Sequence, residues 1–319
     1  MGDPAATVLM ATRNRAEHLA PTLDRILASV RCAPFEVEVL LVDNGSTDRT
    51  PVLLAELART SPELVVVYDP VPGKSGALNR ALGHVRGRAI VFTDDDVHVS
   101  ESWVEDMAGP ILAGMTDAVC GKVVLAAHLD RPWLTPALRT DLAEFLDVSG
   151  SAPGMVGANM AASTDAVRRI GFDEELGPGA RGFADDVLLN LRLKAGGFRL
   201  TGCTGPPVEH HLSPDRLNHT TMQRLARSNG SSHAYLWHHW LHADLRWLRL
   251  RRLRAQFELA RLRRRGPKLP DGISQREYEL WYAYSFAREL AVERGTPRNY
   301  PDGSGSGADD TGRGTPAHP

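Results

Sequence analysis

Hydrophobic and polar positions alternate in two patterns along the first half of the chain. Short apolar runs, rich in β-branched residues, predict buried strands at 6–11, 37–42, 64–68 and 89–93. Between these runs, apolar residues recur at helical spacing and predict helices at 17–30, 51–58 and 76–85. Strands that alternate with helices in this way form βαβ units, so the predicted fold class is α/β with a mostly parallel sheet.

The second half of the chain has a less regular pattern. We expect helices at 103–113, 138–146, 164–170 and 185–196, and strands at 118–125, 155–162 and 198–201. After about residue 216 the composition changes, and residues 216–295 are expected to form a helical, Arg-rich extension. Residues 296–319 consist mostly of Gly, Ser, Asp, Thr and Pro, which predicts a disordered tail.

Three consecutive carboxylates, Asp94, Asp95 and Asp96, directly follow the apolar run at 89–93. Adjacent anions at the end of a buried strand repel one another, and divalent cations that prefer oxygen ligands relieve that repulsion. The carboxyl end of a parallel strand is also where open α/β sheets bind ligands. The triplet therefore predicts a metal site, and a solvated acidic turn is the alternative.

Three further turns after strands are candidates for the same crevice: Thr12-Arg13, Asp43 and Gly73-Lys74. Asp43 has the alternative role of opening an Asx-turn. Lys74 is not part of a Walker phosphate loop, because Tyr68 stands where that motif requires glycine. A lysine before a helix N-terminus is nevertheless suited to neutralising a diphosphate.

Together these segments resemble the family 2 glycosyltransferases, which have the GT-A fold and use nucleotide-sugar donors. The resemblance extends over about residues 5–212 and depends on the order and spacing of seven segments: 10–15, 42–48, 73–79, 92–96, 157–160, 172–179 and 185–192. It implies a Rossmann-like catalytic domain at 1–215, with a nucleotide-sugar part at about 1–97 and an acceptor part at about 98–215.

The resemblance also implies an activity. The implied reaction moves a single sugar from a nucleoside-diphosphate sugar to an acceptor hydroxyl or amine, with inversion and with a metal ion. A UDP sugar is the expected donor. The acceptor would belong to a glycan, a lipid-linked molecule or a natural product. Processive transfer is not expected, because Gln223–Arg227 lacks the Trp of the Gln-x-x-Arg-Trp motif.

Donor-binding roles follow from the resemblance position by position. Thr12, Arg13 and Asp43 would line the nucleoside pocket. Lys74 and Asn79 would lie near the ribose and the diphosphate.

Metal-binding roles follow in the same way. Asp96 would bind Mg²⁺ or Mn²⁺ through the donor diphosphate. Asp94 would support it by contacting a metal-bound water or the ribose, so it is counted with both the metal-binding and the donor-binding residues. Asp95 is counted with the donor-binding residues but is expected to act mainly as a spacer. His210, rather than its neighbour His211, would be the further metal ligand.

Asp185 and Asp186 stand where these enzymes carry a Glu-Asp pair, so the resemblance implies a catalytic role for them. Asp186 would be the general base that removes the proton of the acceptor hydroxyl. The Asp at 185 departs from the family pattern and leaves open which carboxylate is the base. A helix start favours the ionised form of either one, and simple helix capping is the alternative role.

The arginines of 246–265 alternate with leucines and one phenylalanine. Such a helix either contacts an anionic membrane or packs, solvated, on the catalytic domain. Nucleic-acid binding is not expected, because the net charge is −2. The sequence does not define the oligomeric state.

Two other functions fit an acidic metal site on an α/β sheet. A nucleotidyltransferase should carry a Gly-rich loop after the first strand, but Thr12-Arg13-Asn14-Arg15 contains no glycine. A catalytically inactive sugar-nucleotide-binding module is disfavoured because Asp94, Asp96 and Asp186 are present. The odd number of cysteines, 3, and the lack of an apolar leader or span predict a cytoplasmic protein, with peripheral contact to the inner face of the membrane as an addition.

Overall fold

The structure is a computed structural model and describes residues 2–150, 153–243, 245–265, 269 and 271–300. The chain divides into two compact units. Unit 1 comprises Met1–Ala126, Ala143–Gly179 and Asp185–Leu212, and unit 2 comprises Ala127–Leu142, Ala180–Ala184 and Ser213–Pro319. The tail predicted for 296–319 lies outside the described residues from 301 onward.

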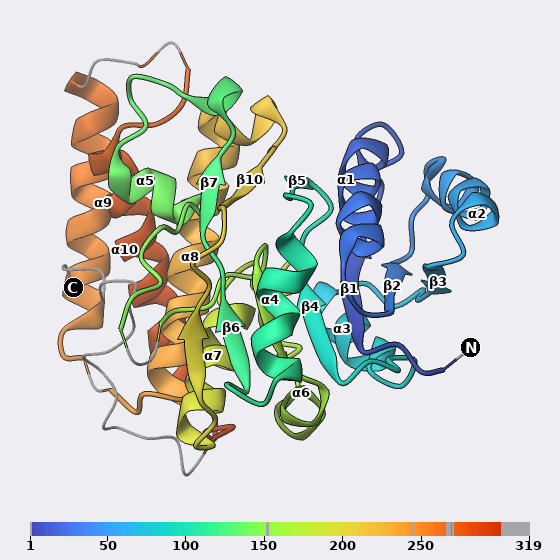
Figure 1. The fold of residues 1–319 in the computed structure, drawn as a ribbon. Helices are drawn as coiled ribbons and strands as arrows, with labels where there is room; N and C mark the ends of the chain where they lie inside the picture. Colours follow the sequence, from blue (N-terminus) through green and yellow to red (C-terminus); the bar gives the residue numbers. More distant parts are fainter. Residues whose placement is uncertain (1, 151–152, 244, 266–268, 270, 301–319) are drawn as a thin grey trace. The chain divides into compact units, whose positions relative to one another are not determined.

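Unit 1 contains a seven-stranded sheet in the order β3-β2-β1-β4-β8-β6-β9 (Figure 1). All neighbouring strands are parallel except β8, which is antiparallel to both β4 and β6. The mostly parallel α/β sheet predicted from the sequence is therefore confirmed. The strands are β1 (Ala6–Thr12), β2 (Val37–Asp43), β3 (Leu64–Tyr68), β4 (Ala89–Phe92), β6 (Ala118–Cys120), β8 (Met160–Ser163) and β9 (Leu200–Gly202).

Helices cover both faces of this sheet because the strands are apolar on both sides. Val8 and Met10 of β1 pack in one core with α1 (Leu19–Cys32), α2 (Thr50–Thr60) and α4 (Trp103–Leu112), and Figure 1 shows α4 in front of β4 and β6. Leu9, between them in sequence, packs in the opposite core with three other helices, α3 (Lys74–Ala81), α6 (Thr164–Ile170) and α7 (Asp185–Ala195).

A second sheet of three short strands lies in unit 1, in the order β5-β10-β7. Its strands are β5 (Val97–His98), β7 (Val123–Leu125) and β10 (Val208–His210). β10 is antiparallel to β5 and parallel to β7, and His210 pairs with Val97. This pairing brings His210 to the segment that follows the acidic triplet.

The structure differs from two of the predicted strands. The run at 118–125 forms two strands in different sheets, because the chain turns at Gly121, where a Cβ atom would overlap the Asn159 side chain. The strand expected at 155–162 begins only at Met160, since Asn159 N–H donates to Val156 O in a turn.

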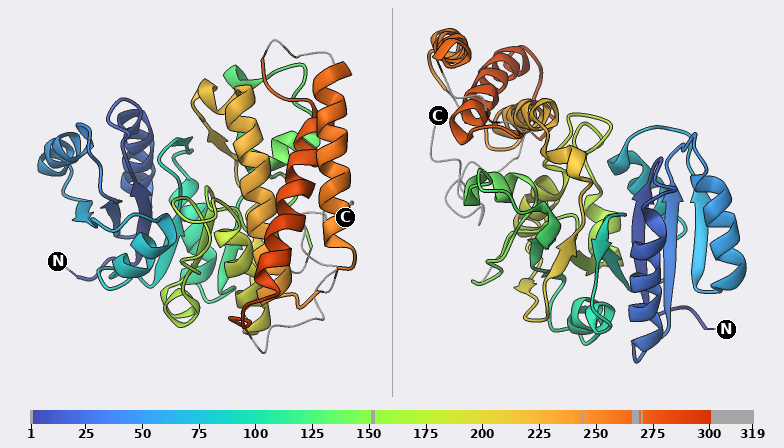
Figure 2. Two further views of the ribbon diagram at one scale, coloured as in Figure 1. Left: turned by 180° about the vertical axis from the view of Figure 1, so that it is seen from behind. Right: turned by 90° about the horizontal axis from the view of Figure 1, so that it is seen from above.

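Unit 2 is helical. α8 (His219–His239), α9 (Leu248–Arg265) and α10 (Gln275–Glu293) lie side by side with α10 in the middle, as Figure 2 shows. The unit also includes η1 (Ala127–Leu129), α5 (Pro136–Asp141) and η2 (Pro214–Leu217). Among the described residues, none of the helices has the length and apolar content needed to cross a bilayer.

Candidate active site

Polar side chains gather at the carboxyl ends of β1, β2 and β4 in unit 1. Thr12 and Asp43 are the last residues of β1 and β2 and lie opposite each other in the parallel register. Both are buried, and Asp43 accepts a hydrogen bond from Ser46 N–H, which closes the turn after β2. The acidic triplet follows β4, the other parallel neighbour of β1.

Two of the three aspartates, Asp95 and Asp96, share Arg15 as a partner. Asp95 accepts a hydrogen bond of 2.6 Å from the Thr12 hydroxyl and pairs with Arg15 at 3.1 Å. Asp96 Oδ2 lies 3.1 Å from the Arg15 guanidinium, and Asp96 Oδ1 lies 3.1 Å from His210 Nε2. One arginine therefore bridges two buried carboxylates.

Burial and charge shift the titration of these groups in opposite directions. Burial raises the pKa of Asp95 to about 6, although the Arg15 charge lowers it. Burial also lowers the pKa of Arg15, but the charges of Asp95 and Asp96 outweigh this effect and leave it above its ordinary value. The cation and the anions stabilise each other inside the site.

Lys74, the first residue of α3, pairs with Asp94. Its position is fixed by the backbone, because Lys74 N–H donates to Pro178 O and Gly73 N–H donates to Asn44 Oδ1. Asn44 is buried and also donates to Val71 O, so it joins the turn after β2 to the loop that carries Lys74.

The Lys74 ammonium group lies between the triplet and the second carboxylate pair. A Cβ atom placed on Gly157 would be 3.7 Å from Lys74 Nζ and 3.8 Å from Asp186 Oδ2. Burial lowers the pKa of Lys74, but the charges of Asp94, Asp185 and Asp186 raise it well above its ordinary value. Lys74 therefore stays charged and neutralises carboxylates on both sides.

Asp185 and Asp186 begin α7 but lie in different surroundings. Asp185 is buried, and this burial together with the neighbouring Asp186 raises the pKa of Asp185 to about 6 despite the attraction of Lys74. Asp186 is half-buried and accepts hydrogen bonds from Gly157 N–H at 2.9 Å and Val187 N–H at 2.7 Å. Asp186 is therefore the more solvent-accessible carboxylate of the pair.

Gly177 allows Asp185 to be buried. Its φ of 84° lies in the left-handed region, and a Cβ atom there would meet Ser75 Oγ at 2.7 Å and Asp185 Cγ at 2.9 Å. The Ser75 hydroxyl donates to Leu176 O, which ties the glycine loop to α3. Close backbone packing, rather than flexibility, requires glycine at this position.

The donor atoms around Asp96 fit a divalent cation. His210 is buried, and Nε2 is the ring nitrogen that faces Asp96, 3.1 Å from Asp96 Oδ1. A carboxylate beside an imidazole is a donor set that accepts Mg²⁺ or Mn²⁺ when the substrate supplies further oxygens. A second group of donors, His98, Glu209 and His211, lies on the same small sheet with its ligand atoms within 4.8 Å of one another.

The structure places other candidates away from these contacts. Arg13 is exposed in the loop after β1. The Asn79 amide donates to Phe172 O at 2.9 Å and accepts from Phe172 N–H at 2.8 Å, so it fixes the 172–179 loop in place. Its proposed contact with a donor stays a prediction. His211 Nε2 bonds Glu209, whereas its neighbour His210 faces Asp96.

Sequence reasoning missed two polar residues that position the site, Arg15 and Asn44. Both lie inside segments that carry the family resemblance, 10–15 and 42–48. A signal for Arg15 was present in the sequence: it is a cation three residues after the end of β1, and three aspartates follow the neighbouring strand β4. No comparable signal marks Asn44, because its partners are mainly backbone groups of residues 69–73.

Curated relatives match the chain over part of their length. The beta-monoglucosyldiacylglycerol synthase of Nostoc sp. is 27% identical over 194 residues, which are 60% of this chain and 41% of the relative. The uncharacterized glycosyltransferase YaiP of Escherichia coli is 28% identical over 200 residues, 59% of this chain and 47% of the relative. The chain thus spans less than half the length of these relatives.

A solved structure shares the fold. The mannosyltransferase PcManGT from Pyrobaculum calidifontis, in complex with GDP-Man and Mn²⁺, has a TM-score of 0.51 and 21% identity, over 92% of this chain and 74% of that one. This likeness supports the predicted GT-A fold. The family described as Glycosyl transferase family 2 matches residues 7–171, about half of the chain. The chain belongs to this family, glycosyl transferase family 2.

Proposed function

We propose that the chain is a metal-dependent, inverting glycosyltransferase that moves a single sugar from a nucleoside-diphosphate sugar to an acceptor hydroxyl or amine. The main support is the position of Lys74, which pairs with Asp94 and also lies beside Asp186. One cation thus connects the carboxylates suited to a metal and diphosphate with the carboxylate suited to a base. The UDP type of the donor and the class of the acceptor stay predictions.

Asp96, Asp94 and His210 would hold the metal, which when bound would neutralise charge on the diphosphate leaving group. Lys74 would add a fixed positive charge to the same side, since its neighbours keep it protonated. Thr12 and Arg15 hold Asp95 in place, and Asp95 helps to fix the triplet. This supports a positioning role for Asp95 rather than ligation.

Asp186 is the proposed general base. Its half-buried carboxylate accepts two backbone hydrogen bonds that fix its orientation, whereas Asp185 is buried and its pKa is raised to about 6. An ionised carboxylate can remove the acceptor proton as the acceptor oxygen attacks the anomeric carbon from the face opposite the diphosphate. This attack inverts the configuration.

Donor binding is tested by thermal shift with UDP and with GDP, each with and without Mn²⁺. We expect the melting temperature to rise most when nucleotide and metal are both present, because each supplies charge that the other needs. Mn²⁺ with inorganic sulfate serves as the control for non-specific anion binding. Indifference to every nucleoside diphosphate would disprove the proposed donor class.

The base assignment is tested by Asp186→Asn. We expect transfer to fall by about 10²- to 10⁴-fold, the usual contribution of a general base, with the nucleotide thermal shift unchanged. Asp165→Asn is the matched control, because Asp165 also begins a helix but is exposed on α6. Normal transfer by Asp186→Asn would show that another group is the base.

A further inference from the structure

The outward face of α9 is unusually apolar for a surface helix. Leu250, Leu253 and Phe257 are 62%, 49% and 69% exposed, and Trp247 just before the helix is 75% exposed. We call Leu250, Leu253 and Phe257 the exposed stripe. At about 100° of rotation per residue, these three side chains fall within about 60° of one another on the helix. Together they form one contiguous apolar surface rather than scattered exposed residues.

The same helix satisfies its packing needs on its other side. Leu248, Ala255 and Leu259 are buried, and Leu248 packs in a core with Phe286 and Leu290 of α10. These positions lie about 180° around the helix from the exposed stripe. The exposed stripe is therefore not needed to hold α9 in unit 2, and another contact must account for it.

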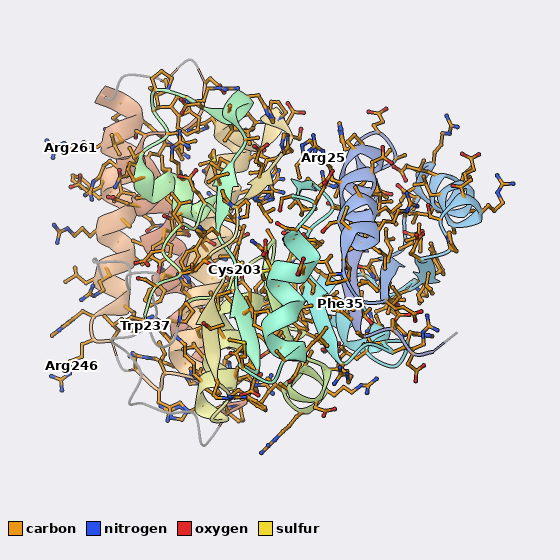
Figure 3. The ribbon with its side chains drawn as sticks, in the orientation of Figure 1. Arg25, Phe35, Cys203, Trp237, Arg246 and Arg261 are labelled. Atoms are coloured by element: carbon orange, nitrogen blue, oxygen red, sulfur yellow. The ribbon has the colours of Figure 1, made fainter. Side chains whose placement is uncertain are left out.

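Arginines surround the exposed stripe. Figure 3 shows Arg246 and Arg261 extending outward from this part of the chain. The exposed arginines of α9 within about 80° of the centre of the stripe, together with the exposed Arg246 just before the helix, form what we call the arginine rim: Arg246, Arg249, Arg254, Arg261 and Arg264. The one acidic residue of the helix, Glu258, is half-buried. In the part of the chain that the structure describes, no ion pair involves the arginine rim.

The backbone also presents Trp247 to solvent. Its φ of 64° lies in the left-handed region, which is costly for a bulky aromatic residue. An exposed indole ring has an apolar body and a polar N–H group. At the start of a basic helix it is therefore suited to the interface between water and lipid.

We propose that the exposed stripe and the arginine rim bind the surface of an anionic lipid bilayer. The apolar side chains would enter the boundary between headgroups and acyl chains, while the guanidinium groups pair with lipid phosphates. A second copy of the chain would bring two arginine rims together, which like-charge repulsion disfavours. A nucleic acid would satisfy the arginines but would leave the exposed stripe in water.

The proposal is independent of the transfer reaction, because it is tested without donor or acceptor. The purified full chain is sedimented with vesicles of phosphatidylcholine, or of phosphatidylcholine mixed with phosphatidylglycerol. We expect tight binding to the mixed vesicles, weak binding to phosphatidylcholine alone, and loss of binding at high salt. A protein that stays in the supernatant with both kinds of vesicle overturns the proposal.

Two sets of variants separate the apolar and ionic contributions. Replacing the exposed stripe by serine should weaken binding to mixed vesicles by at least about tenfold. Replacing Arg249, Arg254 and Arg261 by glutamine should weaken it by about 100-fold, since each arginine near an anionic leaflet contributes about fivefold. The matched control changes Val52 and Met115, two exposed apolar residues of unit 1, to serine. This control variant should bind mixed vesicles as strongly as the wild type does.

Thermal melting verifies that each variant is folded. Binding of the serine variant at wild-type strength would overturn the proposal, and so would binding of polyuridine RNA as tightly as mixed vesicles. Tryptophan fluorescence gives a second measurement: the emission should shift to the blue on mixed vesicles, and Trp247→Phe should remove most of that shift. An unchanged shift in Trp247→Phe would contradict the predicted orientation of the surface.

Discussion

Asp185 is a buried carboxyl group that destabilises the folded protein at neutral pH. Its pKa is raised to about 6, chiefly by burial and then by the neighbouring charge of Asp186. In an unfolded chain the pKa of an aspartate is about 3.9, and each pKa unit corresponds to about 1.4 kcal/mol, so ionisation of Asp185 costs about 3 kcal/mol of folding free energy. Asn resembles the protonated carboxyl group in size and hydrogen bonding and carries no charge.

The sign of the effect follows from proton linkage. Because the folded state holds the proton more tightly than the unfolded state, Asp185 adds most stability below about pH 4, and that contribution is lost as pH rises through about 6. Asp185→Asn avoids the loss. We therefore expect it to raise the free energy of unfolding by up to about 3 kcal/mol at about pH 7.5 and to have little effect at about pH 4.

Urea denaturation at both pH values measures this difference. Asp165→Asn is the control, because it removes the same charge from an exposed helix start. A gain of equal size at both pH values would indicate a packing effect unrelated to ionisation. A variant no more stable than wild type at about pH 7.5 would refute the assignment of a costly charge to Asp185.

Two further changes test the packing and charge of the site. Arg15→Gln should lower the free energy of unfolding by about 1–3 kcal/mol without metal, because it leaves Asp95 and Asp96 without their shared cation. Urea denaturation measures this loss, and Mn²⁺ should restore part of it; no loss would show that the pairs are neutral for stability. Gly177→Ala should cost about 1–3 kcal/mol from the contact with Asp185 and the left-handed backbone. A melting temperature equal to that of the wild type would contradict that steric argument.

The sequence predicted those parts of the fold that local pattern determines. The long apolar runs became β1 to β4, and the order of βαβ units determined which turns share one sheet edge. β5 and β10 were not predicted, because strands this short leave no measurable alternation. Their pairing nevertheless brings His210 to Asp96, so a contact between residues 114 positions apart depends on two strands without a sequence signal.

The roles of single residues were harder to predict than the fold. α9 was expected either to meet a membrane or to pack on the protein, and the structure shows one buried stripe and one exposed stripe on the same helix. Hydrophobic periodicity detects one apolar face on a helix. Two apolar stripes on opposite sides of α9 cancel in that periodicity, so the sequence pattern cannot distinguish membrane contact from packing on the protein. The buried side determines how α9 packs, and the exposed side is what the membrane proposal explains.

The acidic triplet shows how the structure changes the reasoning about metal. Repulsion among three adjacent anions suggested that a bound cation was needed, but Arg15 and Lys74 already balance much of that charge. Both oxygens of Asp96 are engaged, one by Arg15 and one by His210. A metal must therefore compete for Asp96, and a diphosphate favours it by adding oxygen ligands and by offering Lys74 another anion. On the proposed function, metal and nucleotide should then bind cooperatively, with each raising the affinity of the other by the same factor.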